Sequence, residues 1–546
     1  MYTFDHGDEA RHNCRSPDNG FYQVVVTCHG LDVVEGRRST VASFDSILYN
    51  DPAGHISAPA ECLSDLQLDA IIAALAPDVD QNLRAHYYTW ARDVDEVHYR
   101  HEVFRDLSDP SSAAVVQEFV DNVNEMRTRW QRSAALSHRW QRHGWQLHAM
   151  DSYCRAVAHL DDMMSSRALR SRGLTALRDY LHEYRGSPQF NQFLADTNAV
   201  RDDITSIRYL VHINGLHVDV DRGHDEPDYG TEIATLFARF RHELGRDYLT
   251  KIQDYPEFNH VEEQILDRVG SLYPDPFRRL ADHCQRYEHY IDATLERFSR
   301  EVCFYLSYLT FSQQFSQCGL PFCYPTMSER FTEVSAEGIY DMALAMKRLP
   351  AHMPVQNDFA LSGTDRILII TGPNQGGKTT FARTVGQLAY LGALGVPVPA
   401  RRASLMLPDG IFTHFERQER VASLHGKLDE ELVRIRDVLA QATDRSVIVM
   451  NESFASTALA DALEISKDVL QRIIDTGSMA VFVTFLDELT RLHPACVSMV
   501  GDIDPSDPGL RTFHFTRRPA DGLAYASARA EQYGLSPELL SRRLIR

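Results

Sequence analysis

The sequence has no apolar run that approaches the roughly 20 residues needed to cross a membrane as a helix. Its first residues, MYTFDHGDEARHNC, are acidic and polar, which excludes a secretory signal peptide there. Basic side chains are in the minority: 56 Lys and Arg stand against 76 Asp and Glu, and the formal net charge is -20. We therefore expect a cytoplasmic protein without a membrane partner, in which any contact with nucleic acid requires a local basic patch.

Cysteine is scarce as well, with nine residues in a chain of 546, and no Cys/His cluster has the spacing of a zinc site. The closest pair is Cys318 and Cys323, in CGLPFC. We expect reduced thiols that are mostly buried and hold no metal. A chain of 62.1 kDa is too long for one core, so about two to four domains are expected.

The first two segments of the chain differ in periodicity. Residues 1–43 are predicted to be an N-terminal extension, in which FYQVVVTCHGLDVV is either a short strand pair or, as its polar flanks favour, part of a disordered segment.

Residues 44–345 are predicted to form a mostly helical core and lever region. Apolar residues there recur at helical spacing at Cys284, Tyr287, Ile291, Leu295, Phe298, Val302, Tyr305 and Leu309. Because no Pro or Gly interrupts Ala281 to Cys318, we expect one long helix, serving as a lever or as a core helix.

One segment of the helical region has the pattern of a β-hairpin. DITSIRYLVHINGLHVDVDR, residues 203–222, alternates apolar and polar residues on either side of Asn214-Gly215. Asn-Gly between such runs is the strongest short-range signal for a hairpin.

Residues 346–546 have a different pattern. Short apolar runs, RILIIT, SVIVM and MAVFVT, alternate with helical stretches, which is typical of a mainly parallel sheet covered on both faces. The predicted fold is therefore multidomain, with a mostly α-helical region followed by an α/β domain.

A phosphate-binding loop is predicted in the α/β domain. GPNQGGKT fits G-x-x-x-x-G-K-[ST], with an apolar run before it and a helical pattern after it. Backbone N–H groups of such a loop surround phosphates, and the following helix directs its positive end at them. Lys378 is expected to contact the β- and γ-phosphates and Thr379 to bind Mg²⁺. The residues predicted to bind ATP are Gly372, Pro373, Asn374, Gln375, Gly376, Gly377, Lys378, Thr379 and Thr380.

The run SVIVMNES supplies the remaining polar residues of the predicted site. Glu452 is a candidate to orient the attacking water, and with Lys378 it is one of two predicted catalytic residues. Asn451 stands where a second carboxylate usually binds the metal, and it offers only a neutral oxygen. Bound Mg²⁺ keeps waters that can contact such an oxygen. We therefore expect a Mg²⁺-dependent ATPase that hydrolyses ATP slowly but is still active.

Six segments, in order, resemble the ATPase domain of the MutS family of mismatch-repair proteins. They are HMPVQND, TGPNQGGKTTF, PDGIFTHFERQE, NESFAST, VTFLDELTRL and RRPADGLAYASARAEQYGLSPELL. The sequence is most similar to a divergent branch with NESFAST in place of DE-x-GRG-T. The resemblance implies an ABC-type P-loop domain, ATP and Mg²⁺ as ligands, a homodimer formed through the ATPase domains, and helical arms that engage DNA.

The chain also departs from the family pattern. Phe485 replaces a His, and the signature loop has LHGKLDEELVRI, where Lys427 or the backbone near Gly426 would have to act. Leu428, Leu432, Ile435 and Leu439 are predicted to form one apolar face of the helix that follows. An N-terminal mismatch-reading domain, a Phe-x-Glu wedge and an LDLHG-type nuclease segment are not recognisable, so classical mismatch recognition is not expected.

One basic segment is a candidate nucleic-acid surface. MRTRWQRSAALSHRWQRHGWQLH contains Trp130, Trp140 and Trp145 and the candidate contacts Arg127, Arg129, Arg139 and Arg142. The alternative, favoured on an acidic chain, is an amphipathic helix whose tryptophans lie in the core. Two functions remain open: a DNA-coupled dimeric ATPase, or a nucleotide-dependent switch or scaffold with little hydrolysis that acts on RNA, a ribosome or a protein.

Overall fold

The computed structural model describes residues 44–49, 56–57, 60–76, 81–215, 217–223, 258–416, 427–504 and 510–520. All of them belong to one compact unit, Ala42–Arg546. The predicted N-terminal extension, most of the signature loop and most of the last resembling segment lie outside the described residues. No helix within the described ranges is both long enough and apolar enough to span a membrane.

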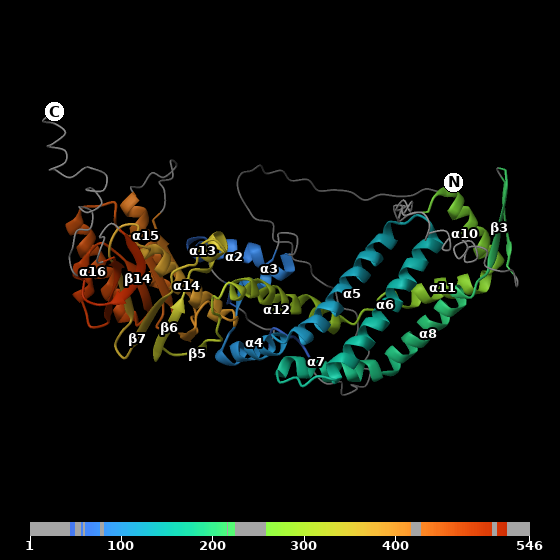
Figure 1. The fold of residues 1–546 in the computed structure, drawn as a ribbon, viewed down its shortest axis with the longest axis horizontal. Coiled ribbons are helices and arrows are strands. Elements are labelled where there is room, and N and C mark those ends of the chain that lie inside the picture. The colour runs from blue at the N-terminus through green and yellow to red at the C-terminus, as the bar shows by residue number, and fades with distance from the viewer. Residues whose placement is uncertain are drawn as a thin grey trace, which may run out of the picture. The chain divides into compact units, whose positions relative to one another are not determined.

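Helices make up most of the chain between residues 60 and 317, as predicted (Figure 1). They are α1 (Ala60–Asp65), α2 (Leu68–Leu75), α3 (Gln81–Tyr87), α4 (Val94–Leu107), α5 (Pro110–Ala135), α6 (Arg139–Ser165), α7 (Arg172–Gly186), α8 (Pro188–Thr205), α10 (His260–Leu272), α11 (Pro274–Arg286) and α12 (Ala293–Gln317). A short antiparallel pair, β1 (Ile56–Ser57) and β2 (Thr89–Trp90), also lies in this part.

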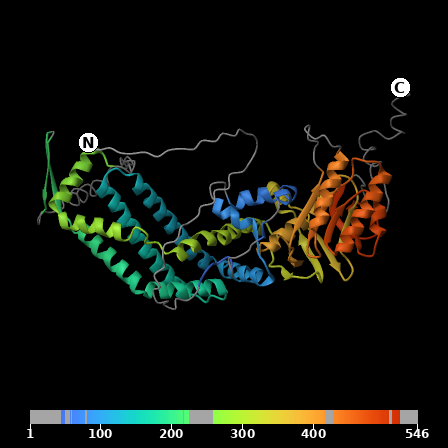
Figure 2. The same cartoon turned by 180° about the vertical axis from the view of Figure 1, so that it is seen from behind.

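The local sequence sets where several of these helices begin. Asp109 and Ser187 each precede a proline, and their side chains accept from the backbone N–H of Ser112 and Phe190, at 3.0 and 3.2 Å. Proline suits the first helical position because its missing N–H would have no partner there. Helices α5 and α6 then lie side by side, as the two opposite views agree (Figures 1 and 2).

The single long helix predicted from Ala281 to Cys318 is wrong. Helix α11 ends at Arg286 and α12 begins at Ala293. Asp292 starts the second helix, because its carboxylate accepts from the backbone N–H of Thr294 and Leu295 at 3.0 and 2.9 Å. A capping aspartate thus divides the apolar pattern without any proline or glycine.

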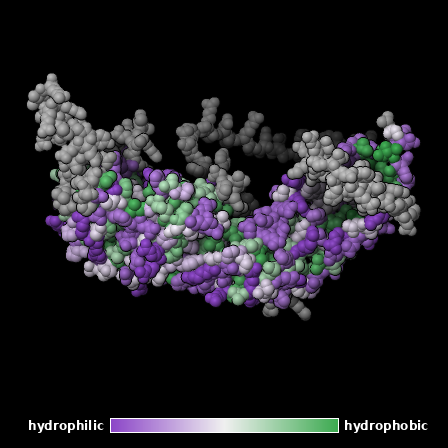
Figure 3. All heavy atoms as spheres, in the orientation of Figure 1, coloured by the Kyte–Doolittle hydropathy of each residue, from purple (hydrophilic) through white to green (hydrophobic). Residues whose placement is uncertain are grey.

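A hairpin lies at the Asn214-Gly215 pair. Strands β3 (Tyr209–Asn214) and β4 (His217–Arg222) are antiparallel, and Gly215 has φ 64°, which an Asn-Gly turn requires. The predicted start at residue 203 is too early, because α8 continues to Thr205. Hydrophobic side chains gather over the hairpin in Figure 3, and Ile213 is 74% exposed.

Two sheets form the α/β part. A four-stranded sheet has the order β5-β9-β6-β7, from β5 (Thr326–Ser328), β6 (Glu333–Ile339), β7 (Asn357–Ser362) and β9 (Arg402–Met406). A six-stranded sheet has the order β10-β11-β12-β8-β13-β14, from β8 (Ile367–Thr371), β10 (Ile411–Phe415), β11 (Val447–Asn451), β12 (Met479–Val483), β13 (Cys496–Ile503) and β14 (Arg511–Arg517). Its first five strands are parallel, and β14 is antiparallel to β13.

The remaining helices belong to this α/β part. They are α13 (Met342–Arg348), α14 (Lys378–Ala393), α15 (Lys427–Gln441), α16 (Leu459–Thr476) and the 3₁₀ helix η1 (Asp487–Arg491). Every residue of β8, β11 and β12 is buried, which explains their continuous apolar runs. The predicted combination of a helical region with an α/β fold is therefore confirmed.

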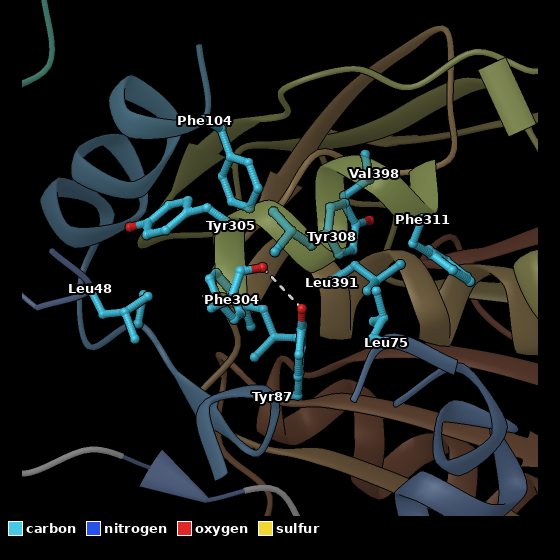
Figure 4. Packing of buried hydrophobic residues seen from close by; sticks show 14 of the residues in the cluster. Leu48, Leu75, Tyr87, Phe104, Phe304, Tyr305, Tyr308, Phe311, Leu391 and Val398 are labelled. Carbon is cyan, nitrogen blue, oxygen red and sulfur yellow. Dashed lines mark hydrogen bonds between the residues drawn. The ribbon is translucent and has the colours of Figure 1, made fainter. Parts of the chain in front are cut away.

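The two parts share a hydrophobic core that contains both Phe44 and Phe515. Figure 4 shows part of it, with Tyr87, Phe104, Phe304, Tyr305 and Tyr308 beside Leu391 and Val398. The Tyr87 hydroxyl donates to the Phe304 carbonyl at 3.0 Å, and the Tyr390 hydroxyl donates to the Tyr87 carbonyl at 2.6 Å. Helix α14 is thereby held by helices that lie far away in the sequence. A domain boundary at residue 346 stays a prediction.

Candidate nucleotide-binding site

The loop between β8 and α14 has the backbone that its glycines predict. Gly372 and Gly377 have φ 126° and 92°, in the region that favours glycine. A Cβ on Gly372 would come within 2.9 Å of the Gly501 backbone nitrogen, and a Cβ on Gly376 within 2.8 Å of the Pro373 carbonyl oxygen. The loop is therefore compact, and the 16-residue helix α14 begins directly after it at Lys378.

Lys378 is buried at the start of α14, with 4% of its surface exposed. Its Nζ donates to the carbonyl oxygens of Gly372 and Pro373, at 3.1 and 3.4 Å, and to Asn374 Oδ1 at 3.3 Å. Desolvation lowers the pKa of this lysine, and the charge of Glu452 raises it again in part. The ring centroid of Phe485 lies 4.5 Å from the same nitrogen.

Thr379 and Asn451 contact each other directly. The Thr379 hydroxyl donates to Asn451 Oδ1 at 2.8 Å, and Asn451 is 8% exposed at the end of β11. Parallel strands place their carboxyl ends at one edge of a sheet, and the loop after β8 lies at that edge. Two residues that the sequence assigned to a metal are thus adjacent. Their oxygens are hard donors of the kind that Mg²⁺ accepts alongside water, so the pair fits this ion.

The turn after β11 has an unusual backbone. Glu452 and Phe454 have φ 52° and 65°, a region that non-glycine residues rarely adopt. Neighbouring contacts hold the turn: Glu452 N–H donates to the Val483 carbonyl at 3.0 Å, and Phe454 N–H donates to a Glu431 carboxylate oxygen at 3.2 Å. Backbone strain of this kind persists only where the surrounding contacts fix the conformation. Here the contacts of the turn fix the backbone of Glu452.

A cavity of about 520 Å³ lies beside Lys378, Thr379 and Glu452. Of the predicted residues, Gln375, Gly377, Lys378, Thr379, Thr380 and Glu452 line it. Sequence reasoning assigned no role to Arg348, Asn357 and Phe513, which also line it and come from the end of α13, from β7 and from β14. Asn357 joins two of these elements, since its side-chain nitrogen donates to the Phe513 carbonyl at 3.1 Å and its oxygen accepts from the Phe515 N–H at 2.8 Å.

The helix predicted after the signature loop is α15. Ile435 is buried, and Leu428 and Leu439 pack against the same cluster. Leu432 was assigned to the same apolar face, but it is exposed. The apolar face is therefore narrower than the periodicity predicted.

Two of the four candidate nucleic-acid arginines have partners within the protein. Arg127 Nη2 donates to Glu296 and Ser299 at 3.4 and 3.2 Å, and Arg129 Nη2 donates to Glu125 at 2.6 Å. Arg139 stacks on the ring of Trp140 at 4.0 Å and is exposed, whereas Arg142 is half-buried. Trp130 and Trp140 are half-buried and pack against hydrophobic clusters, which agrees in part with the packing alternative. The single amphipathic helix of that alternative is wrong, because α5 ends at Ala135 and α6 begins at Arg139.

In the part of the chain that the structure describes, the cysteines and other metal-ligating side chains do not gather. Cys62, Cys154, Cys284, Cys303, Cys318, Cys323 and Cys496 are reduced thiols. Within the described ranges, no three His, Cys, Asp or Glu residues are grouped so that they could hold a metal ion.

A glycine loop that leads from a buried parallel strand into a helix, with polar side chains at the neighbouring strand end, is typical of α/β domains that bind phosphates. Comparison with known proteins shows which family of such domains this region is similar to. The family model described as MutS domain V matches residues 368–505, which contain the loop and both strand ends of the site.

Individual relatives are similar over shorter or longer stretches of the chain. A DNA mismatch repair protein MutS from Shouchella clausii is 28% identical over 320 residues, which are 57% of this chain and 35% of the relative. MutS from Thermotoga neapolitana is 27% identical over 286 residues, 51% of this chain and 34% of the relative. MutS from Erythrobacter litoralis is 35% identical over 146 residues, 27% of this chain and 17% of the relative.

The chain therefore spans 35% or less of the length of these relatives. Residues 368–505 match the MutS domain V model and about half of the chain is similar to MutS proteins, so the predicted resemblance to the MutS family is confirmed. Its α/β part contains the region that is similar to MutS domain V.

Proposed function

We propose that this chain binds ATP with Mg²⁺ in the cavity beside the β8–α14 loop and hydrolyses it slowly. The observation that carries the proposal is the meeting of Lys378, Thr379, Asn451 and Glu452 at one strand edge. The match of residues 368–505 to the MutS domain V model supports it, since the resemblance of this region to the MutS ATPase domain implies ATP as a ligand. The phosphates would be held by the backbone N–H groups of the loop, by the N-terminus of α14 and by the Lys378 ammonium.

Hydrolysis would use a water beside Glu452. The water oxygen attacks the γ-phosphorus, the bond from phosphorus to the β–γ bridging oxygen breaks, and ADP leaves with that electron pair. The Glu452 carboxylate takes the proton that the water loses. Mg²⁺, when bound, would neutralise charge on the β- and γ-phosphates, and Thr379 and Asn451 are the residues placed to hold it.

A second copy of the chain is the partner proposed for the open side of this cavity. Two large apolar side chains with about half of their surface exposed line it, Met353 and Phe513. Exposed apolar surface around a site is typical of a surface that another protein covers. A dimer formed through the ATPase domains would cover it, and the nucleotide state would then change how the helical arms hold DNA.

The alternative is a nucleotide-dependent switch or scaffold with little hydrolysis. The apolar ring of Phe485 against Lys378 favours it, because a benzene ring offers no hydrogen bond to phosphate or water. With a net charge of -20, an RNA, ribosomal or protein partner fits such a switch at least as well as DNA does.

ATP turnover by the purified full chain, with and without DNA of several shapes, tests the proposal. Lys378→Ala serves as the control, since it removes the ammonium but not the loop. Turnover that rises with one form of DNA and is lost in the control supports the DNA-coupled ATPase. Tight, Lys378-dependent ATP binding without turnover favours the switch. Absence of Lys378-dependent binding contradicts both.

A further inference from the structure

A second cavity, with a volume of about 700 Å³, lies within the helical part of the chain. It is formed where the end of α4, the start of α5 and the segment between α6 and α7 come together (Figure 1). Three arginines line it: Arg105 from α4, and Arg167 and Arg170 from the segment before α7. It shares no lining residue with the nucleotide cavity, so any ligand it holds is bound by a different set of groups.

The guanidinium groups of this cavity are only partly used by the protein itself. Arg105 stacks on the ring of Tyr324, with its Cζ 4.6 Å from the ring centroid, and stacking leaves the N–H groups at its edge available. Within the described ranges, neither Arg105 nor Arg170 forms an ion pair, whereas Arg167 Nη1 lies 3.5 Å from an Asp109 oxygen. The cavity therefore offers at least two guanidinium groups as donors to a ligand.

The same cavity offers hydrogen-bond acceptors. Asp106 Oδ2 accepts from the backbone N–H groups of Arg170 and Ser171 at 2.9 and 2.8 Å, which also brings Arg170 next to the end of α4. Asp109 Oδ2 accepts from the Ser112 N–H at 3.0 Å and so caps α5. In the part of the chain that the structure describes, the Oδ1 atoms of both aspartates have no hydrogen-bond partner. Each aspartate thus uses one oxygen for the fold and keeps one for a ligand.

This combination of donors and acceptors indicates the chemistry of the ligand. A guanidinium binds a phosphate through parallel hydrogen bonds, and a carboxylate oxygen accepts from a sugar hydroxyl. Three arginines and three carboxylates, Glu102 being the third, line the cavity, so a ligand that is only an anion gains little net attraction. The volume lies in the range of roughly 300 to 1,000 Å³ that is typical of small-molecule sites. Among the described residues that line it, there is no aromatic ring on which a nucleobase could stack.

We propose that this cavity binds a small phosphorylated sugar. Arg105 and Arg170 donate to the phosphate oxygens, and Asp106 and Asp109 accept from the sugar hydroxyls through Oδ1. This site goes beyond the proposed function and does not depend on it. The ribose-phosphate backbone of RNA presents the same two groups, so the experiment includes RNA as a second source of this chemistry.

Isothermal titration calorimetry of the full chain with ribose 5-phosphate tests the proposal, with inorganic phosphate and ribose as separate probes. We expect ribose 5-phosphate to bind about tenfold more tightly than inorganic phosphate, because hydroxyls and phosphate are both recognised. Arg170→Gln should weaken its binding about tenfold, on the order of what one charge-assisted hydrogen bond contributes. Its side chain forms no ion pair among the described residues, so this substitution leaves the fold intact.

Two controls accompany Arg170→Gln. Arg178→Gln removes an arginine of α7 that pairs with Asp179 outside the cavity, and it should leave binding unchanged. Lys378→Ala should also leave it unchanged, which separates this site from phosphate binding at the β8–α14 loop. Loss of binding in either control overturns the proposal.

Asp109→Asn tests the recognition of the sugar. Asparagine caps a helix as well as aspartate does, so its amide oxygen takes the capping position and its NH₂ group replaces the free oxygen. Binding of ribose 5-phosphate should weaken about fivefold, while binding of inorganic phosphate should not weaken. Equal affinities for ribose 5-phosphate and inorganic phosphate in the unsubstituted chain overturn the assignment of a sugar.

The remaining outcomes concern the source of the phosphate. If ribose 5-phosphate does not bind, or binds Arg170→Gln as tightly as the unsubstituted chain, the proposal is wrong. If a single-stranded RNA binds in an Arg170-dependent way and ribose 5-phosphate does not bind, the small ligand is likewise wrong and the cavity contacts a nucleic-acid backbone.

Discussion

The hydroxyl of Thr379 donates a hydrogen bond to Oδ1 of Asn451, 2.8 Å away. An amide oxygen accepts such a bond as a carboxylate would, so the local geometry does not require an aspartate. What the amide lacks is the negative charge. A carboxylate at this position would attract Mg²⁺ more strongly and would also accept from Thr379.

Asn451→Asp should therefore strengthen Mg²⁺ binding and raise ATP turnover. We expect the Mg²⁺ concentration for half-maximal turnover to fall about tenfold, because one full charge is added beside the ion. Turnover measured over a Mg²⁺ titration checks this. Asn451→Ala is the matched control: it removes the partner of Thr379, should cost about 1 kcal/mol of stability, and should not raise turnover. Unchanged turnover in Asn451→Asp would mean that the absence of a carboxylate at position 451 does not limit the rate of ATP hydrolysis.

Arg139 and Arg142 form no ion pair with a carboxylate in the part of the chain that the structure describes, in contrast to Arg127 and Arg129. If they bind DNA phosphates, the double substitution Arg139→Glu and Arg142→Glu should abolish DNA retention at moderate salt. The salt dependence of the affinity should also weaken. The slope of the logarithm of the binding constant against the logarithm of the salt concentration should fall in magnitude by about one for each phosphate that is no longer neutralised. Filter binding at several salt concentrations measures both quantities.

Arg127→Ala is the control for this experiment. Arg127 bonds to Glu296 and Ser299, which links α5 to α12, so its loss should lower stability and leave DNA retention unchanged. If the Arg139/Arg142 double variant still retains DNA, these two arginines do not form the DNA-binding surface.

The parts of the site that are close in sequence were predictable. The glycine loop, Lys378, Thr379 and the Asn451-Glu452 pair each belong to a short pattern, and the parallel strands bring these patterns together. Asn214-Gly215 likewise sets the hairpin, since its turn geometry is local. Such features need little information from the rest of the fold.

The remaining features depend on contacts between distant segments. Periodicity could not reveal that Asp292 caps a second helix after the first has ended, because the apolar spacing continues through the break. Nothing in the sequence near Phe513 indicates that it lines the cavity, since β14 reaches the site only by pairing with β13. The contact of Phe485 with Lys378 also required the structure, although the sequence identified Phe485 as a departure from the family pattern.

Arg100 ties the helical part to the C-terminal end of α14. It is almost completely buried, with Nη2 2.9 Å from Glu96 and Nη1 donating to the Leu394 carbonyl at 2.7 Å. Arg100→Ala would leave the buried Glu96 carboxylate with only the more exposed Arg92, whose Nε is 3.4 Å away, as a cation. We expect a loss of about 3–5 kcal/mol in the free energy of unfolding, measured by urea denaturation.

The double substitution Arg100→Met and Glu96→Leu is the matched control for Arg100→Ala. It removes both charges and keeps the volume apolar, so it should recover a large part of the lost stability. A double variant that is no more stable than Arg100→Ala would show that the hydrogen bonds of Arg100 to the Leu48 and Leu394 carbonyls, and not the buried charge, carry the effect.

His101 should make the protein sensitive to acid. It is 1% exposed, and burial, followed by the charges of Arg105, His98 and Arg100, lowers its pKa to about 3. In the unfolded chain the same imidazole titrates at its ordinary value of 6.5, so between these values the unfolded state binds more protons than the folded state. Stability therefore falls as the pH is lowered through this window, with a slope of up to about 1.4 kcal/mol per pH unit from this group.

His101→Gln removes this titration and stays uncharged at every pH. Glu301, whose pKa burial raises, contributes a slope of the opposite sign, but it is present in both proteins and cancels in the comparison. Urea unfolding at pH 7, 6 and 5 should show the variant losing less stability on acidification than the unsubstituted chain. Parallel stability curves for the two proteins would mean that His101 becomes protonated in the folded state, and that its burial does not exclude the charge.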